Sequence, residues 1–280
     1  MRFARIGEPG QEREVVWDGQ AWRDISALTA DRKLGCIGLS GDEVSAALGG
    51  PNAPSLAEPF RFGAPLKSIG KIICVGLNYR DHARETNAAE PAEPIMFMKA
   101  PDTVTGPHDD VLIPRNSVKT DWEIELGVVI GTQARYLPDP DQAMSHVAGY
   151  VISHDVSERE FQIEHGAQWD KGKNCETFNP LGPWFVTADE AGNPQDLTMR
   201  LWVNGDLRQH GTTADMIFGV SYLVWYFSQF MVLYPGDVIN TGTPAGVALG
   251  RPGTPYLRPG DVVALEIDGL GRQRQTLAQA

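Results

Sequence analysis

Two carboxylates with alternate spacing occur in the segment 121–127, which reads DWEIELG. If this segment is a β-strand, its side chains alternate between two faces, so Glu123 and Glu125 share one face with their Cβ atoms roughly 6.6 Å apart. Two like charges this close repel each other, and a shared cation would remove the conflict. The pattern therefore predicts a metal site, although a half-exposed strand with a polar outer face fits it too.

A third carboxylate, Asp155, follows the apolar run 147–153, where the chain leaves a predicted strand for a helix predicted over 157–165. An aspartate at this point either caps the helix or ligates an ion. Oxygen ligands without cysteine suit Mg²⁺ or Mn²⁺ better than zinc. Glu123, Glu125 and Asp155 are therefore candidate ligands of one divalent ion.

A histidine and a glutamate lie one turn apart in the segment 79–86, which is predicted to be helical after a buried strand over 71–76. His82 and Glu85 are i and i+3 neighbours on such a helix. A carboxylate beside an imidazole fixes its tautomer and raises its basicity, as in an oriented general base. An ordinary polar pair on a surface helix is the alternative reading.

Further cations and hydroxyl groups accompany these residues. Arg159 and Gln162 are i and i+3 on the helix predicted after Asp155, so they share one face. Lys173 lies in the loop stretch KGKNCETFNPLGP and is either a solvated lysine or part of a site. The turn 241–246, TGTPAG, offers hydroxyls and backbone N–H groups that could bind a carboxylate.

The elements that carry these groups are mostly short strands. A chain of 280 residues with 30 glycines and 20 prolines is typical of a fold with many turns. Hairpins are predicted at Asn204-Gly205 and at 269–271, and a third helix over 218–230. We therefore predict a β-rich α+β fold, with a small N-terminal domain over 1–68, joined through the Pro- and Gly-bearing stretch 49–65, and a catalytic domain over 69–280.

Composition limits the possible partners and location. The net charge is −12 and no cluster of Lys and Arg occurs, which argues against nucleic acid and membrane surfaces as partners. The three cysteines are far apart and form neither a disulfide framework nor a zinc-ribbon pattern. The N-terminus lacks the apolar region of a signal peptide, and the most apolar stretch, 220–234, is too short to span a bilayer. We therefore expect a cytoplasmic protein that acts on a small molecule.

Six motifs in order resemble those of the fumarylacetoacetate hydrolase family from Ile72 to the C-terminus: GLNYRDHARE, PIMFMKAP, KTDWEIELGVVIG, SHDVSEREFQ, KGKNCETFNPLGPW and PGDVINTGTPAGV. The resemblance implies a β-roll-type catalytic domain, usually in a homodimer, and one Mg²⁺ or Mn²⁺ ion held by Glu123, Glu125 and Asp155. It also implies catalytic roles for His82, Glu85 and Lys173. The positions that match substrate-contacting residues of the family are Tyr79, Arg159, Gln162 and Thr243.

Within the family, the chain most resembles bacterial enzymes that act on acylpyruvates and on 2,4-diketo-3-deoxy sugar acids such as the fuconate-derived one. This implies a hydrolase that cleaves the carbon–carbon bond of a 2,4-diketo acid to pyruvate and a carboxylic acid. Oxaloacetate decarboxylation or isomerisation of a 2-hydroxy-diene-dioate at the same site is the alternative, and a metal-stabilised protein without catalysis is a third. Asn78 stands near the position of an additional aspartate ligand in eukaryotic members, so fumarylacetoacetate itself is not expected as the substrate.

Overall fold

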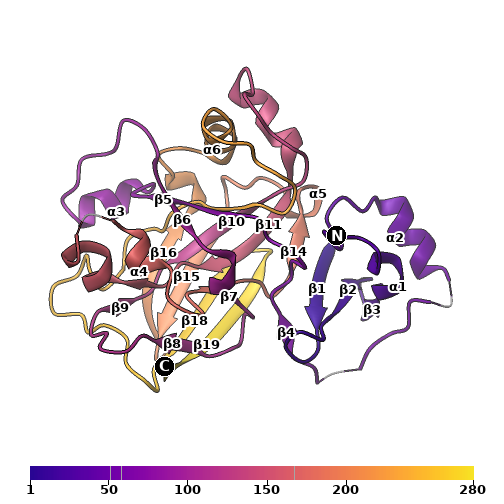
Figure 1. Ribbon diagram of the computed structural model, residues 1–280, viewed down its shortest axis with the longest axis horizontal. Helices are drawn as coiled ribbons and strands as arrows, with labels where there is room; N and C mark the ends of the chain where they lie inside the picture. The colour runs from indigo at the N-terminus through magenta and orange to yellow at the C-terminus, as the bar shows by residue number, and fades with distance from the viewer. Residues whose placement is uncertain (51, 58, 167) are drawn as a thin grey trace.

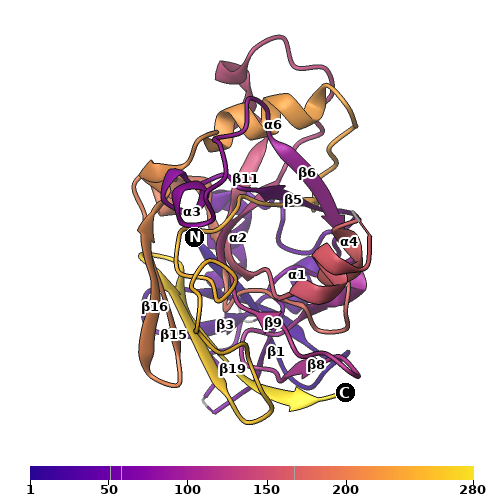
Figure 2. The same cartoon turned by 90° about the vertical axis from the view of Figure 1, so that its left-hand side faces the viewer.

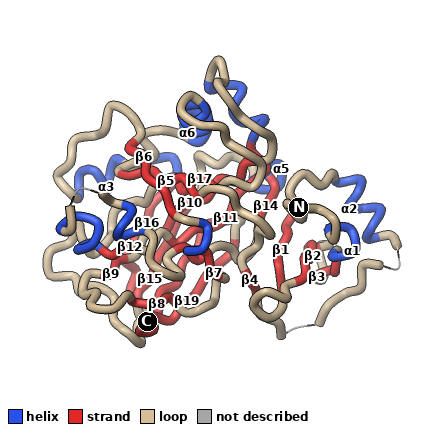
Figure 3. Tube along the Cα trace, in the orientation of Figure 1, coloured by secondary structure: helices blue, strands red, loops and turns tan. Residues whose placement is uncertain are grey.

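Strands form most of the regular structure in the computed structural model, which describes residues 1–50, 52–57, 59–166 and 168–280. Figure 3 shows the strands at the centre and short helices at the periphery. The strands form two large sheets and two small ones. The predicted β-rich α+β fold is therefore confirmed, since helices neither alternate with strands nor cover both faces of a parallel sheet.

The larger sheet has ten strands in the order β3-β2-β1-β14-β11-β10-β17-β5-β6, with β4 beside β1. Its centre is the antiparallel pair of β10 and β11, which both consist largely of buried apolar residues. The strands of this sheet are β1 (Arg2–Ile6), β2 (Arg13–Trp17), β3 (Trp22–Asp24), β4 (Phe62–Gly63), β5 (Ile72–Gly76), β6 (Ile95–Lys99), β10 (Ile124–Ile130), β11 (Val147–His154), β14 (Phe185–Thr187) and β17 (Val238–Asn240).

The second sheet has five strands in the order β16-β15-β18-β19-β8. Both predicted hairpins are confirmed here, because Val203 pairs with Asp206 across Asn204-Gly205 and Ile267 pairs with Gly271. The strands are β8 (Val111–Ile113), β15 (Thr198–Val203), β16 (Asp206–Thr212), β18 (Val262–Ile267) and β19 (Gly271–Gln279). The small sheets pair β7 (Val104–Thr105) with β13 (Asn179–Pro180) and β9 (Thr120–Asp121) with β12 (Ser157–Glu158).

The main hydrophobic core lies between the two large sheets. Alternate residues of β10 enter it together with alternate residues of β15 and β18, namely Ile124, Leu126, Val128, Ile130, Met199, Leu201, Val203, Val263, Leu265 and Ile267. Burying each such side chain contributes about 1.5–3 kcal/mol relative to leaving it exposed. Because side chains alternate along a strand, the opposite face of β10 carries Glu125 and Val129. The core therefore fixes which way Glu125 points.

The N-terminal residues form a lobe on one side of the molecule (indigo, at the right of Figure 1), with α1 (Ser26–Thr29) and α2 (Gly41–Leu48) beside β1 to β4. The α2 helix starts at a capping box in which Ser40 and Glu43 exchange hydrogen bonds. β1 pairs with β14, so the strands of the lobe continue the ten-stranded sheet. Residues 51 and 58 of the predicted linker 49–65 lie outside the described residues, and the boundary at 68/69 stays a prediction.

The other helices are α3 (Arg80–Glu85), α4 (Asp170–Lys173), α5 (Ala188–Ala191) and α6 (Val220–Ser228), with 3₁₀ turns at Pro101–Thr103, Pro140–His146 and Thr213–Asp215. Figures 1 and 2 show α3 and α4 on the side of the molecule away from the N-terminal lobe. Within the described residues, no helix has the length and apolar character that a membrane crossing requires.

The prediction of a helix over 157–165 is wrong for the first residues of that range. Ser157 and Glu158 pair with β9, and the helix is a π-helical turn over Glu160–Glu164. The reason is local, because the Glu158 carboxylate accepts hydrogen bonds from the Ser117 hydroxyl and from the backbone N–H groups of Lys119 and Phe161. These contacts hold Glu158 against the neighbouring segment and delay the helical turn.

Candidate active site

The three candidate metal ligands come together at one end of the pair β10 and β11. β10 begins one residue after Glu123, and β11 ends one residue before Asp155. Ile124 pairs with His154, and the Asp155 N–H donates to the Glu123 carbonyl oxygen at 3.0 Å. Glu123 is therefore not inside the strand as predicted, but the antiparallel pairing still brings all three side chains to the same place.

The carboxylates of Glu123, Glu125 and Asp155 form one buried cluster. Each residue offers an oxygen atom, and these atoms lie within 4.8 Å of one another. The exposed fractions of the three residues are 6%, 1% and 0%. A buried set of hard oxygen donors is what Mg²⁺ and Mn²⁺ prefer, and the three residues could hold such an ion with further positions open.

Two cations balance part of this charge. The Lys173 ammonium lies 2.8 Å from Glu123 Oε2 and 2.8 Å from Asp155 Oδ2. Arg159 Nη2 lies 2.7 Å from Glu123 Oε1. Although burial opposes ionisation, Lys173 and Arg159 hold the pKa of Glu123 below its ordinary value. Burial disfavours the ammonium, but Asp155 and Glu123 raise the pKa of Lys173, so both partners stay charged.

Glu125 has a different environment. Its Oε2 accepts a hydrogen bond from the Gly242 N–H at 2.8 Å. The ion pairs around the cluster involve Glu123 and Asp155. Within the described residues, Glu125 forms no ion pair. Burial and the charges of Asp155 and Glu123 raise the pKa of Glu125 well above its ordinary value. Gly242 has a φ of +92°, and a Cβ there would lie 2.8 Å from the Asn78 Cβ, so the turn requires glycine.

The predicted dyad lies on α3. His82 Nδ1 is 3.5 Å from Glu85 Oε2, which is longer than an ordinary hydrogen bond. Glu85 is fixed from its other side, where its carboxylate accepts from the Gly246 N–H at 2.9 and 3.0 Å and from Arg251 Nε at 3.0 Å. Against the effect of burial, these donors and His82 lower the pKa of Glu85. With Glu85 on the Nδ1 side, Nε2 is the imidazole nitrogen left for a reacting molecule.

A cavity of about 220 Å³ collects most of the predicted residues. Its polar lining consists of His82, Thr86, Glu123, Glu125, Arg159, Gln162, Lys173 and Thr243. Its other lining residues are apolar or glycine and consist of Val75, Gly76, Leu77, Ala88, Phe97, Ile163, Trp169 and Leu249. The cavity therefore combines charged groups with hydrophobic surface.

Two neighbouring helical turns position the cations. Arg159 Nη1 donates to Gln162 Oε1 at 3.0 Å, so these residues are neighbours as predicted from their spacing. Lys173 ends α4, which packs closely against this turn at Gly172. A Cβ on Gly172 would lie 2.3 Å from the Glu158 carbonyl oxygen and 2.6 Å from the Gln162 Cβ. Only glycine allows this approach, and the approach delivers Lys173 to the carboxylates.

Two residues that were predicted to contact the substrate, Tyr79 and Thr243, make contacts with other parts of the protein. Tyr79 is fully buried, its hydroxyl lies 3.2 Å from Met199 Sδ, and it is not among the residues that line the cavity. This geometry does not support a substrate contact for Tyr79. Thr243 lines the cavity, but its hydroxyl donates to the Ile124 carbonyl at 2.8 Å and accepts from Gln209 Nε2 at 2.7 Å. Its side chain therefore serves mainly to anchor the turn.

Three polar residues near the site were not assigned a role from the sequence. Asp121 accepts from Arg159 Nε at 2.9 Å and from three backbone N–H groups. Lys99 lies 2.5 Å from Asp155 Oδ1. Asn78 holds backbone groups of Phe218 and Thr241. One sequence signal could have identified Lys99. It follows Phe97 by two residues in an apolar strand, so both side chains lie on the same buried face.

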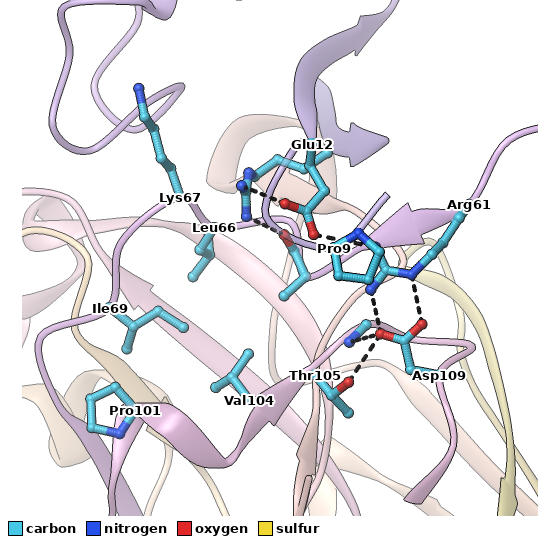
Figure 4. Close-up of a pocket in the computed structure, with 13 residues that line it drawn as sticks. Pro9, Glu12, Arg61, Leu66, Lys67, Ile69, Pro101, Val104, Thr105 and Asp109 are labelled. Carbon is cyan, nitrogen blue, oxygen red and sulfur yellow. Dashed lines mark hydrogen bonds and ion pairs between the residues drawn. The ribbon is translucent and has the colours of Figure 1, made fainter. Parts of the chain in front are cut away.

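A second cavity of about 490 Å³ lies beside the N-terminal lobe (Figure 4). Apart from Lys67, which donates to backbone carbonyl oxygens, its acidic and basic side chains are paired with each other. Arg61 binds Asp109 at 2.5 and 2.8 Å and Glu12 at 3.2 Å, and Arg5 binds Glu12 at 3.1 Å. Because these charges are already neutralised by one another, this larger cavity offers weaker chemistry than the smaller one.

Comparisons with known proteins show what this chain is similar to. Residues 71–278 match the family model described as "Fumarylacetoacetate (FAA) hydrolase C-terminal". The 2,4-didehydro-3-deoxy-L-rhamnonate hydrolase of Sphingomonas sp. (strain SKA58) is 48% identical, with 100% of this chain and 96% of that protein covered.

Solved structures are similar over the whole chain. A fumarylacetoacetate hydrolase from psychrophilic Exiguobacterium antarcticum is 35% identical with a TM-score of 0.84, and both chains are covered completely. A 2-hydroxyhepta-2,4-diene-1,7-dioate isomerase from Mycobacterium marinum is 30% identical with a TM-score of 0.74, covering 100% of this chain and 98% of that one. The similarity therefore extends to proteins named for two different reactions.

Proposed function

This chain belongs to the fumarylacetoacetate hydrolase family, and from that premise we propose that it is a metal-dependent hydrolase of 2,4-diketo acids. It would cleave the bond between C3 and C4 to give pyruvate and a carboxylic acid. The observation that carries this proposal is a cavity lined by two carboxylates of the buried cluster, by two cations and by a histidine, with Asp155 and Glu85 in contact with these lining residues. A cavity of about 220 Å³ suits a small substrate.

Glu123, Glu125 and Asp155 would hold the ion. The donor set fits a hard divalent cation, and an ion would favour the ionised form of Glu125, which forms no ion pair within the described residues. When bound, a divalent ion supplies Lewis-acid stabilisation of negative charge on substrate oxygens. We take Mg²⁺ or Mn²⁺ as the cofactor, because the set contains no sulfur or imidazole ligand.

The protein's own residues account for the remaining requirements. Arg159 and Gln162 both line the cavity and can bind the substrate carboxylate. His82, with Glu85 beside Nδ1, would accept a proton at Nε2 from a water molecule that attacks the C4 carbonyl. Breaking the C3–C4 bond gives the carboxylic acid and the enolate of pyruvate, and the Lys173 ammonium would stabilise the enolate's negative charge. A proton then returns to C3, so one water molecule is consumed overall.

The apolar residues that line the cavity favour an acyl group that ends in a methyl or another apolar group. A 2,4-diketo-3-deoxy acid derived from a 6-deoxy sugar has such an end, and the Sphingomonas relative is named for a compound of this kind. Two of these lining residues, Phe97 and Trp169, form an edge-to-face pair with ring centroids 5.7 Å apart. We therefore place 2,4-didehydro-3-deoxy-L-rhamnonate first among substrates, followed by short acylpyruvates.

The second candidate is isomerisation or decarboxylation at the same site, and the similar structure named as an isomerase favours it. Both reactions need the carboxylates and Lys173, but neither needs an activated water molecule. The His82–Glu85 pair, held by Gly246 and Arg251, favours hydrolysis. By family resemblance we also propose a homodimer, which light scattering of the purified protein would test.

The first experiment measures pyruvate release in a coupled lactate dehydrogenase assay. The substrates are the deoxy sugar acid, two acylpyruvates and oxaloacetate, each with Mg²⁺, Mn²⁺ or EDTA. EDTA-sensitive release from a diketo acid, with an equal amount of carboxylic acid, supports the hydrolase. Release from oxaloacetate alone favours the decarboxylase, and no release from any compound contradicts the proposed substrate class.

A further inference from the structure

Lys99, the last residue of β6, lies behind the carboxylate cluster and is 1% exposed. Its ammonium contacts three acceptors: Asp155 Oδ1 at 2.5 Å, the Phe178 carbonyl oxygen at 2.6 Å and the Val156 carbonyl oxygen at 3.2 Å. An ammonium group has three N–H donors and no acceptor. All of its donors are therefore used inside the protein, and Lys99 is not among the residues that line the cavity.

Asp155 is held from two sides by two lysines with different surroundings. Lys99 contacts Oδ1, whereas Lys173 contacts Oδ2 at 2.8 Å and also contacts Glu123. Lys173 lines the cavity, so its contacts can change when a molecule binds there. Lys99 has no free donor and two backbone carbonyls fix it, so its contact with Oδ1 stays the same whatever the cavity contains.

We propose that Lys99 is a positioning residue that reserves Asp155 Oδ1 and leaves Oδ2 as the one oxygen that Asp155 offers to a divalent ion. This inference rests on the metal site of the proposed function. A carboxylate with both oxygens free can bind an ion through one or both of them, and residues behind a ligand commonly decide its orientation. Lys99 therefore sets both the direction of the Asp155 ligand and the number of its oxygens that an ion receives.

A purely structural role makes a different prediction. Lys99 would then only neutralise a buried aspartate, and its loss would lower stability without changing metal binding. Lys71 provides the matched case, because its ammonium lies 2.5 Å from the buried Asp237, outside the cluster. Lys71→Met removes a lysine from a buried aspartate just as Lys99→Met does, but touches no proposed ligand.

The experiment measures Mn²⁺ binding to the full chain by electron paramagnetic resonance of the free ion. For Lys99→Met, which keeps the length of the side chain and removes its donors, we expect affinity to fall by about 10–100-fold. The spectrum of the bound ion should also change, because Asp155 can then turn or supply both oxygens. Lys99→Gln keeps a donor and should lie between Lys99→Met and the native protein, whereas Lys71→Met should bind Mn²⁺ as the native protein does.

The proposal is overturned if Lys99→Met loses stability but keeps the native Mn²⁺ affinity and spectrum. If the native protein binds no Mn²⁺, the metal site itself fails, and that outcome is distinct because it appears before any substitution. Should neither variant fold, ¹⁵N-lysine NMR of the native protein carries the test. The protons of the Lys99 ammonium should keep slow exchange when Mg²⁺ is added, and a marked acceleration would show that its contact with Asp155 is broken.

Discussion

Replacing Glu125 by glutamine separates two effects of this carboxylate on the folded protein. Without a metal, Glu125 is a buried carboxyl group whose ionisation is opposed by burial, Asp155 and Glu123, with the Gly242 N–H as its hydrogen-bond donor. Glutamine keeps an oxygen that can accept from Gly242 and removes the like-charge repulsion. We therefore expect the melting temperature of Glu125→Gln in EDTA to equal or exceed that of the native protein.

With a metal, the order should reverse. An ion that binds only the folded state stabilises it by about 2.7 kcal/mol at a free concentration of 100 times the Kd. At about 2.1 cal/mol/K per residue, 280 residues give an unfolding entropy near 0.6 kcal/mol/K. The native melting temperature should therefore rise by about 4–5 °C, and the variant's should barely change at the same ion concentration.

The assay is differential scanning calorimetry in EDTA and in Mn²⁺ at 100 times the native Kd. Glu14→Gln is the control, because Glu14 is also a buried glutamate that accepts from a backbone N–H, that of Cys36 at 2.9 Å, but lies in the N-terminal lobe. The control should keep the full metal-dependent rise. A full rise in Glu125→Gln would refute Glu125 as a ligand, and a loss of several degrees in EDTA would refute the argument from charge crowding.

Three further outcomes test the site. Glu85→Gln should lower kcat for diketo acid hydrolysis by about 10²-fold or more while the Mn²⁺-dependent rise in melting temperature is unchanged; an equal loss of both would assign Glu85 to the metal site. In EDTA, the raised pKa of Glu125 means that its contribution to stability is present below about pH 4.5 and is lost as pH rises. In urea unfolding, the difference in unfolding free energy between Glu125→Gln and the native protein should therefore grow with pH. A difference that stays constant with pH would contradict this. His82→Ala should abolish pyruvate release from diketo acids but spare any release from oxaloacetate, and parallel loss of both activities would show that His82 serves a shared step.

Much of the fold could be predicted because its signals are local. The apolar runs of β5 and β11 and the Asn204-Gly205 turn lie within a few residues of the chain, and all three appear as expected. The sheet order could not be predicted in the same way. β1 pairs with β14 across more than 180 residues of sequence, and nothing in either short strand identifies its partner.

The same distinction applies to the site. Glu123 and Glu125 are close because they are two residues apart, and Arg159 meets Gln162 because they are one helical turn apart. Lys99 and Asp155 are 56 residues apart, and Asp121 and Arg159 are 38 apart. Such pairs depend on how distant strands pair and pack, so residue types and spacing alone could not reveal them.

The distribution of charge, more than its total, explains why an ion would bind here. Glu123, Glu125 and Asp155 carry three negative charges, and Lys99, Lys173 and Arg159 carry three positive ones. Burying this many charges is tolerable only if each has partners. Both lysines contact Asp155, and Lys173 and Arg159 contact Glu123, so two carboxylates share all the cations while Glu125 has the Gly242 N–H. A divalent ion would complete the site at the carboxylate that the lysines do not reach. For this reason, substitution of Glu125 should remove metal binding at the least cost to the fold.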